Sequence, residues 1–359
     1  MTGKFLDITF SEIPKKGGDF LLDTIQCSIY TSISLKGGKW IPHNLGLDNK
    51  FEWYWERIYN GITFHYYPYR YTNKRRTPLL WMTFSASTMQ NGINVIGYNF
   101  GKSHLAVKEI EGTIASVVGK PISLKDITCI SRIDMNRDFL CKEEVEKQHI
   151  FNFFKKIKGR SGMECEIYDT GIIIGNSDVK LKFYFKDKDI NLGDEMCLYM
   201  PKMARTEFQI REYRINKYYP ENLNLYTLLT NKRMTEMVWD ALLEEFRISG
   251  EICNKQSLLQ KAKKIFRKTN KIRARKFRQL KQINDINDKV KHRPKTIEQS
   301  KDVINELDKA GICPYSCETS IVLKIDLAPK ATKKKTLYYI IVPSLPKQPI
   351  RLLGYLDSS

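Results

Sequence analysis

Polar and hydrophobic residues alternate over several short stretches of the chain, and this period of two predicts β-strands. The stretches expected to form strands are Thr24–Leu35, Leu79–Ser87, Ile127–Met135, three segments near 164–175, 178–187 and 203–214, and, in the last part of the chain, Thr319–Leu327 and Thr336–Val342. Strands therefore occupy much of the first 214 residues.

Two segments instead place hydrophobic residues three and four apart, which predicts amphipathic helices. The first begins at Ser103 as the N-cap residue, follows Val107, Ile110 and Ile114, and stops at Gly119. The second runs from about Lys142 to Lys158, with its buried side marked by Val145, Phe153, Phe154 and Ile157. From Pro220 onward the pattern is again helical.

This order of elements predicts an α+β fold with a mostly antiparallel sheet, helices packed on one face, and a basic helical C-terminal region. A parallel sheet would need a crossover between consecutive strands, and the strands after residue 164 are too close together for that. We expect two domains, residues 1–225 and residues 226–359.

The charge of the chain favours a polyanionic partner. Sixty Lys and Arg residues against 40 Asp and Glu residues give a formal charge of +20, which suits nucleic acid. Solubility or an acidic protein partner are the alternatives. Between Lys255 and Lys295 there are 16 basic and two acidic residues. An apolar stripe through this segment predicts an amphipathic basic helix that binds phosphates with Arg273, Arg275, Lys276 and Arg278. The alternative is a solvated charged face.

Two further features concern the compartment. No run approaches the roughly 18 to 20 apolar residues that span a bilayer, so no membrane association is expected. The eight cysteines form no Cys-x-x-Cys pair, and no signal peptide is evident. Both observations favour reduced thiols in a cytoplasm.

Three of the predicted strands each carry polar residues on one face. Because side chains alternate along a strand, one face of each strand holds the following sets: Lys180, Lys182, Tyr184 and Lys186; Ile130, Arg132 and Asp134; and Arg205, Glu207, Gln209 and Arg211. If these strands are neighbours, a tyrosine, two carboxylates and several cations meet on one sheet face, and we expect Lys182, Arg205 and Arg211 to contact DNA there.

Such a set suits attack on a phosphodiester. Asp134 and Glu207, with Asp138 as a weaker third candidate, would hold Mg²⁺ or Mn²⁺. Tyr184 would be the nucleophile, with neighbouring lysines favouring its phenolate. The alternative is a solvent-facing sheet with cross-strand ion pairs. The five histidines are isolated in sequence, so a metal would depend on carboxylates. The stretch His65–Arg76 interleaves aromatic and basic residues, which suits either stacking on bases or a strand end with a basic turn.

Several short blocks resemble those of filamentous-phage replication initiators, the gene II protein family, in the same order. They are Asn94-Val-Ile-Gly97, Ser131-Arg-Ile-Asp134, Tyr184-Phe-Lys186 and Arg205-Thr-Glu207 followed by Arg211, within residues 75–230. The segment Arg132-Ile-Asp134 followed by Asp138 is also similar to the Arg-x-Asp-x-x-x-Asp block of rolling-circle plasmid initiators and related relaxases.

The resemblance implies a rolling-circle replication initiator that nicks one strand through a tyrosine. Such an enzyme keeps a 5′-phosphotyrosine link and leaves a 3′ hydroxyl as primer. It implies Tyr184 as nucleophile with Lys186 and Arg132 beside it, and Asp134 and Glu207 as acidic positions. The partners would be single- or double-stranded origin DNA, host replication proteins and a second copy of the chain, in a bacterial cytoplasm.

The sequence also departs from these families. Thr83 and Ser85 stand where the phage proteins have an acidic residue and a lysine, and the paired histidines of the larger class of tyrosine nickases are absent. A relaxase that mobilises a plasmid, or a non-catalytic DNA-binding regulator, are the alternative functions.

Overall fold

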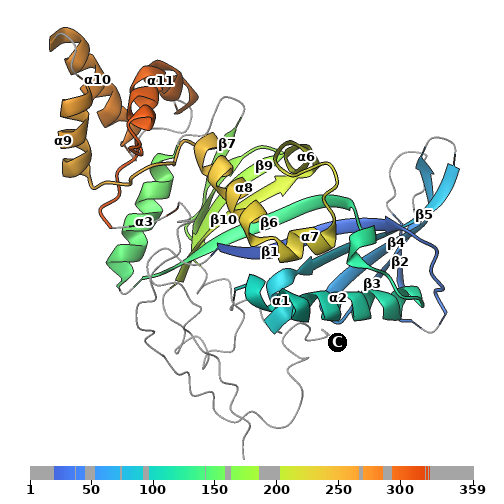
Figure 1. The fold of residues 1–359 in the computed structure, drawn as a ribbon. Coiled ribbons are helices and arrows are strands. Elements are labelled where there is room, and N and C mark those ends of the chain that lie inside the picture. Colours follow the sequence, from blue (N-terminus) through green and yellow to red (C-terminus); the bar gives the residue numbers. More distant parts are fainter. Residues whose placement is uncertain are drawn as a thin grey trace, which may run out of the picture.

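The computed structural model describes residues 20–36, 38–44, 53–72, 75–91, 97–141, 143–157, 163–185, 203–266, 270–285, 293–319, 321 and 323. Within these residues one sheet of ten strands dominates the fold, with its strands in the order β2-β3-β4-β5-β1-β6-β10-β9-β8-β7 (Figure 1). Every pairing between neighbouring strands is antiparallel. The predicted α+β class is confirmed.

Five of the predicted strands are present with shifted ends, and the strand predicted near 164–175 is divided into two, whereas β2, β3 and β4 were not among the predicted strands. The strands are β1 (Phe20–Tyr30), β2 (Ile41–Asn44), β3 (Trp53–Tyr59), β4 (Ile62–Thr72), β5 (Arg75–Ser85), β6 (Cys129–Leu140), β7 (Glu164–Ile167), β8 (Gly171–Gly175), β9 (Val179–Phe185) and β10 (Met203–Arg211). The basic stretch that begins at His65 forms part of the β4–β5 hairpin. The side chains of residues 69–77 lie outside the described part.

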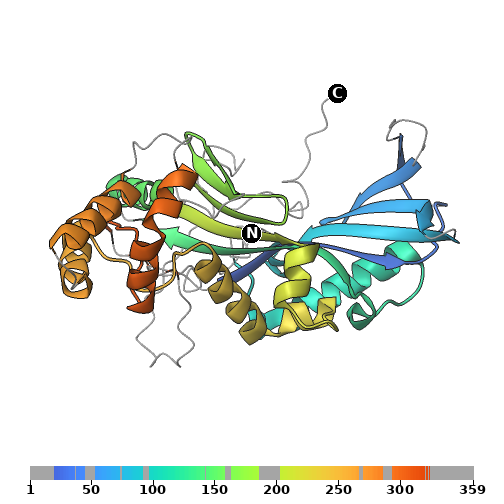
Figure 2. The same cartoon turned by 90° about the horizontal axis from the view of Figure 1, so that it is seen from above.

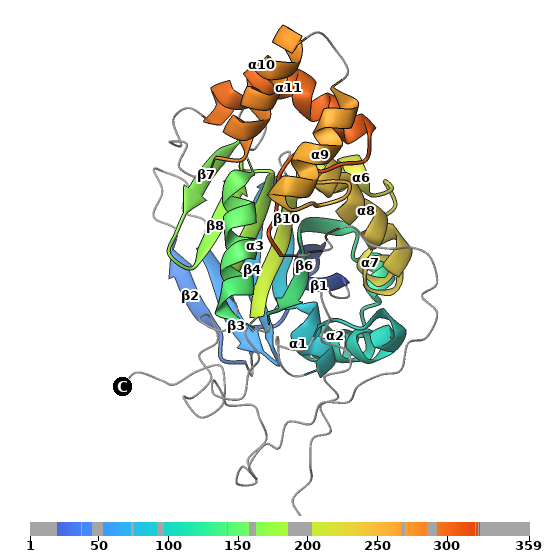
Figure 3. The ribbon, with the colours of Figure 1, turned by 90° about the vertical axis from the view of Figure 1, so that its left-hand side faces the viewer.

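The helices follow or interrupt the strands. They are α1 (Ala86–Asn91), α2 (Ser103–Val118), α3 (Glu144–Lys156), α6 (Glu212–Tyr218), α7 (Leu225–Thr230), α8 (Lys232–Glu245), α9 (Lys255–Ile265), α10 (Asn270–Ile283) and α11 (Arg293–Lys309). Helices α1, α2, α7 and α8 lie along the sheet, whereas α9 to α11 group together beyond α3, in orange and red (Figures 1 and 3).

Aromatic packing joins the sheet to its helices. The residues of β9 alternate between buried and partly exposed, and Phe183 on the buried face stacks on Phe154 of α3 with ring centroids 4.6 Å apart. On β10 the buried Phe208 meets Trp239 of α8 at 4.8 Å and Phe246 at 5.4 Å. The opposite face of both strands is therefore left for their polar residues.

Both predicted amphipathic helices are present, with local corrections. Ser103 is the first residue of α2 rather than its N-cap, because a short 3₁₀ turn capped by the Asn99 side chain precedes it. Gly119 ends α2 in the left-handed conformation with φ of 79°, as expected. In α3 the expected core residue Val145 is 56% exposed, whereas Lys147 is buried.

The basic segment differs from the single amphipathic helix expected. It is divided between α9, α10 and the start of α11, and Leu258, Ala262, Leu280 and Ile283 from these helices are buried together with α11 residues. The predicted strand Thr319–Leu327 is not formed at Thr319, Ile321 and Leu323. Its remaining residues and the predicted strand Thr336–Val342 lie outside the described residues.

The segment that follows α11 returns to the sheet and its helices. Lys156 Nζ of α3 donates to the Ser316 carbonyl at 2.8 Å, and Trp239 Nε1 of α8 donates to the Leu323 carbonyl at 2.8 Å. One hydrophobic core runs from Leu22 to Leu323. The expected boundary at residue 225 thus falls at the start of α7, within this core. In the described part of the chain, no helix has the length and apolar character needed to cross a membrane.

Candidate active site on one sheet face

The strands β9, β10 and β6 are direct neighbours, so their polar faces form one surface. Cross-strand pairing sets Tyr184 opposite Arg205, and Arg205 opposite Asp138. Two residues further along β10, Glu207 lies between Lys182 on β9 and Asn136 on β6. The structure thus brings the three sets of polar residues together, as the alternation predicted. We call this surface the polar face.

Arg205 and Asp138 are the most deeply buried charges of the polar face, each with 1% of its surface exposed. The Arg205 guanidinium contacts both Asp138 and Asp23. Its Nε and Nη2 donate to the two oxygens of Asp138 at 2.6 and 2.8 Å. Its Nη1 donates to Asp23 Oδ2 on β1 at 2.8 Å. Arg205 was expected to contact DNA. Its guanidinium is instead enclosed by two carboxylates, so it acts as a buried structural residue of the polar face.

Asp23 is a member of this network that the sequence analysis did not select. Besides Arg205 it accepts hydrogen bonds from Ser85 Oγ and Asn136 Nδ2, both at 2.9 Å. The signal for it was a charged residue directly after the apolar run Phe20–Leu22, because a carboxylate buried in a strand needs a partner. Ser85, which departs from the phage pattern, is one of those partners.

A second group centres on Glu207, which is 6% exposed. Lys182 Nζ donates to its Oε1 at 2.7 Å, and the Tyr184 hydroxyl donates to its Oε2 at 3.1 Å. The tyrosine therefore has a carboxylate, rather than a lysine, as its direct hydrogen-bond partner. Lys186, the other expected neighbour of Tyr184, lies outside the described residues.

A third group joins Arg132 to Asp134 on β6. The Arg132 Nε donates to Asp134 Oδ1 at 2.8 Å, and its Nη2 binds Oδ2. With its amide turned so that the oxygen faces the guanidinium, Gln209 accepts from Arg132 Nη2 at 2.7 Å. The Arg132 side chain is 21% exposed and that of Asp134 is 2% exposed, so the cation covers the carboxylate.

The environments of the two central carboxylates push their pKa values apart. Burial raises the pKa of Asp134 to about 7; the hydrogen bond from Arg132 opposes this shift, and the Glu207 charge adds to it. For Glu207, burial acts to raise the pKa, but the charge and hydrogen bond of Lys182 outweigh it and the pKa is lowered. At neutral pH, Glu207 can accept a proton while Asp134 can carry one.

The expectation that lysines favour the Tyr184 phenolate is wrong for this arrangement. Burial and then the negative charge of Glu207 raise the pKa of Tyr184 well above its usual value. The physical reason is that Lys182 is paired with Glu207 and presents its charge there. Tyr184 is thus a neutral phenol that needs a base to become a nucleophile.

The residues expected to hold Mg²⁺ or Mn²⁺ do not form a ready metal site. Asp134 is paired with Arg132, Glu207 with Lys182, and Asp138 with Arg205. Among the residues that the structure describes, no three His, Cys, Asp or Glu side chains converge as metal ligands. A divalent ion would have to displace one of these cations.

The histidines are not all isolated, in contrast to their spacing in sequence. His65 Nε2 on β4 lies 3.1 Å from Glu56 Oε2 on β3, and His43 Nε2 on β2 lies 4.0 Å from the same atom. The Tyr54 ring stacks on His43 at 4.8 Å and on Tyr67 at 5.4 Å. Pairing between neighbouring strands puts this group on the same side of the sheet as the polar face.

The predicted DNA-binding residues of the basic segment separate into two kinds. Arg275 and Arg278 on α10 are exposed. Arg273 is partly exposed, and its Nη2 donates to the Lys263 carbonyl at 3.1 Å. Lys276 is 3% exposed, binds Glu306 of α11 and lies over the Phe266 ring. Lys276 therefore joins helices and is not available to a phosphate.

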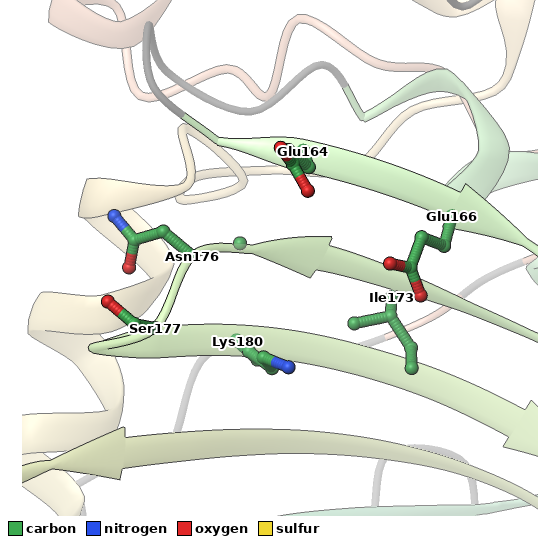
Figure 4. A pocket seen from close by; sticks show the side chains of 7 residues that line it. Glu164, Glu166, Ile173, Asn176, Ser177 and Lys180 are labelled. Carbon is green, nitrogen blue, oxygen red and sulfur yellow. The ribbon is translucent and has the colours of Figure 1, made fainter. Parts of the chain in front are cut away.

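Two hollows border the polar face. One, of about 540 Å³, lies at its Arg211 end and is also lined by Trp81 and Tyr213. The other, of about 270 Å³, lies over β7 to β9, where Glu164, Glu166 and Lys180 line it (Figure 4). Arg211 is exposed, so a cation and two aromatic rings border the larger hollow. These groups suit a phosphate and a base.

Comparison with known proteins does not identify the chain. No protein-family model matches it, and no curated protein matches its sequence. Of the blocks that carry the phage resemblance, Asn94 to Ile96 lie outside the described residues. The other blocks supply Arg132, Asp134, Tyr184, Arg205 and Glu207 to the polar face.

The raised pKa of Asp134 makes stability depend on pH in a defined direction. The unfolded carboxyl has a pKa of about 3.9, so between about pH 4 and pH 7 the native state binds more protons than the unfolded state. This contribution to stability is present at low pH and is lost as pH rises, by at most ~1.4 kcal/mol per pH unit. The variant Asp134→Asn should lack this loss of stability.

Urea unfolding of both proteins in excess chelator measures this effect. As pH rises from about 4 to 7, the free energy of unfolding should fall for the wild type relative to that of Asp134→Asn. Parallel curves would show that Asp134 is ionised throughout this range.

Proposed function

We propose that the chain is a tyrosine nickase that cuts one DNA strand to initiate rolling-circle replication. The observation that supports this most is the hydrogen bond from the Tyr184 hydroxyl to Glu207, whose lowered pKa keeps it ionised as an acceptor, with Asp134 of raised pKa on the adjacent strand. A nucleophile, a base and an acid are the three groups that strand transfer to a tyrosine needs.

The first steps follow from these contacts. Glu207 takes the phenol proton as the Tyr184 oxygen attacks phosphorus. A bond forms between this oxygen and phosphorus, and the bond from phosphorus to the 3′ oxygen breaks. Lys182 and Arg132, each about one-fifth exposed, stabilise the charge that develops on the phosphate.

The departing 3′ oxygen needs a proton, which Asp134 supplies at neutral pH. The products are a 5′-phosphotyrosine and a 3′ hydroxyl from which a host polymerase extends. A requirement for Mg²⁺ or Mn²⁺ stays a prediction, and no step here is assigned to a metal.

Tyr184 should be the residue that becomes joined to DNA. The test uses a pool of single-stranded oligonucleotides of random sequence, labelled at the 3′ end, with Mg²⁺ or Mn²⁺ present. Wild type should retain label after denaturation, and Tyr184→Phe should lose most of that adduct because it has no oxygen to attack phosphorus. Peptide mapping then identifies the modified side chain.

Tyr168→Phe is the matched control, because Tyr168 is 52% exposed and also bonds a glutamate, Glu166. It should form the adduct as the wild type does. Binding without any adduct, in wild type as well, would favour the non-catalytic regulator. Full cleavage in excess chelator would exclude the metal requirement but leave the tyrosine mechanism intact.

Substrates with different leaving groups should distinguish the role of the acid, Asp134, from that of the base, Glu207. Asp134→Asn and Glu207→Gln should each slow cleavage by about 10²- to 10⁴-fold on ordinary DNA. In a substrate with sulfur in place of the bridging 3′ oxygen, the leaving group departs without protonation. This substrate should restore the rate of Asp134→Asn and not that of Glu207→Gln, as single-turnover measurements will show. Equal recovery of both variants would contradict the separate roles.

The basic helix α10 should contribute phosphate contacts through its exposed arginines. Each phosphate neutralised on duplex DNA adds about −0.9 to the slope of log affinity against log salt. Changing Arg275 and Arg278 to Gln together should flatten this slope by up to ~1.8. Lys276→Gln should leave the slope unchanged and lower stability, because Lys276 is buried against Glu306. An unchanged slope in the double variant would mean that the basic face of α10 is only a solvated surface and makes no phosphate contacts.

A further inference from the structure

The larger of the two hollows, of about 540 Å³, lies where the two parts of the sheet meet. Figure 2 shows the blue strands of the first part of the chain beside the green and yellow strands of the second part. The hollow is lined by Trp81 of β5, Ser131 of β6, Arg211 at the end of β10, and Asp178 in the turn between β8 and β9. Small-molecule sites commonly measure about 300–1,000 Å³, so a single nucleotide unit fits this space.

Two aromatic rings border the hollow. Trp81 is half-buried and lies on the same side of the sheet as the polar face, because Thr83, two residues further along β5, is aligned through Gln26 of β1 with Arg132 of β6. Tyr213 of α6 is 64% exposed. Every base has a π face that can stack on such a ring. These rings therefore favour a base in the hollow but do not choose among the four bases.

The Asp178 carboxylate supplies a choice. The backbone of this residue is held on both sides, because its N–H donates to Asn176 Oδ1 at 3.0 Å and its carbonyl accepts from the Arg211 N–H at 2.9 Å. A carboxylate only accepts hydrogen bonds, and Glu212 adds a second one to the lining. Guanine alone among the DNA bases has two adjacent donors on its Watson–Crick edge, N1–H and the N2 amino group. The two oxygens of one carboxylate match that pair.

The charges of the hollow favour a base with one phosphate over a row of phosphates. Asp178 and Glu212 line it with two carboxylates against the one cation of Arg211. The Arg211 side chain is exposed, and in the described part of the chain it has no hydrogen-bond or ion-pair partner. A single phosphate can therefore lie at Arg211. A free triphosphate would also approach the carboxylates, and like charges placed together are unfavourable.

We propose that this hollow binds a guanine base of the single-stranded substrate, which stacks on Trp81, donates to Asp178 and places its phosphate at Arg211. The identity of the substrate rests on the proposed function. Arg211 lies six residues (211 − 205) along β10 from Arg205, which is paired with Tyr184. Six residues of a strand span about 20 Å. The guanine therefore lies several nucleotides from the cut and fixes where along the strand Tyr184 attacks.

Binding of short oligonucleotides in excess chelator tests the hollow without cleavage. The probes for the full-length protein are a labelled oligothymidine and the same oligonucleotide with one central guanine. Wild type should bind the guanine probe about 5- to 150-fold more tightly, the discrimination of one bidentate base contact, as fluorescence anisotropy will measure. Asp178→Asn should lose this preference, because its amide puts a donor in place of one acceptor oxygen.

Asp169→Asn is the matched control, because it makes the same change of charge at an exposed residue of the turn between β7 and β8. It should keep the preference for guanine. Equal affinity of wild type for the two probes, or a preference that survives in Asp178→Asn, would overturn the guanine site. The proposed function would still stand if Tyr184 forms its adduct. A guanine preference without any adduct would support the hollow and contradict the nickase.

Free 2′-deoxyguanosine 5′-monophosphate distinguishes a DNA base from a free nucleotide. It should bind far more weakly than the guanine-containing oligonucleotide, because it makes no contact with the polar face. Equal affinity for the two would assign the hollow to a free nucleotide and overturn its role in positioning the DNA strand. Competition against the labelled guanine probe measures this affinity.

Discussion

The buried guanidinium of Arg205 is the interaction on which the polar face depends. It joins Asp23 of β1, Asp138 of β6 and its own strand β10 through three hydrogen bonds of 2.6 to 2.8 Å. A charge this deeply buried is tolerated only when it is paired, and removal of one partner from such a pair costs about 3–5 kcal/mol. A shift of one residue in register would turn Arg205 into the hydrophobic core. The network therefore fixes how the three strands align.

The chemistry of the site follows from that alignment. The β6–β10 register that sets Arg205 against Asp138 places Asp134 diagonally across from Glu207, and the β9–β10 register places Glu207 beside Lys182 and within reach of Tyr184. Burial then acts differently on the two carboxylates because their cations differ in position. Lysine lowers the pKa of Glu207, while burial outweighs arginine at Asp134. Glu207, a carboxylate of lowered pKa, thus stands between the tyrosine hydroxyl and Asp134, a carboxyl of raised pKa.

Alternation along single strands was enough to predict which residues share the polar face, because the side-chain period is fixed by the backbone. It could not predict partners. Lys182 and Tyr184 meet Glu207 through the β9–β10 register, and Lys276 meets Glu306 through helix packing. Asp23 was missed as a member of a cluster because its partners Asn136 and Arg205 are more than 100 residues away in sequence. His43, Glu56 and His65 were missed because β2, β3 and β4 were not among the predicted strands.

The central claim is that single-stranded DNA binds across the polar face, and differential acetylation of lysines tests it most directly. Lys180 and Lys182 point from β9 onto this face, whereas the exposed Lys108 and Lys120 belong to α2 and the turn after it. Addition of single-stranded DNA should slow acetylation of Lys180 and Lys182 and leave Lys108 and Lys120 unchanged, as measured by mass spectrometry. Unchanged reactivity of Lys180 and Lys182 at saturating DNA would contradict the account.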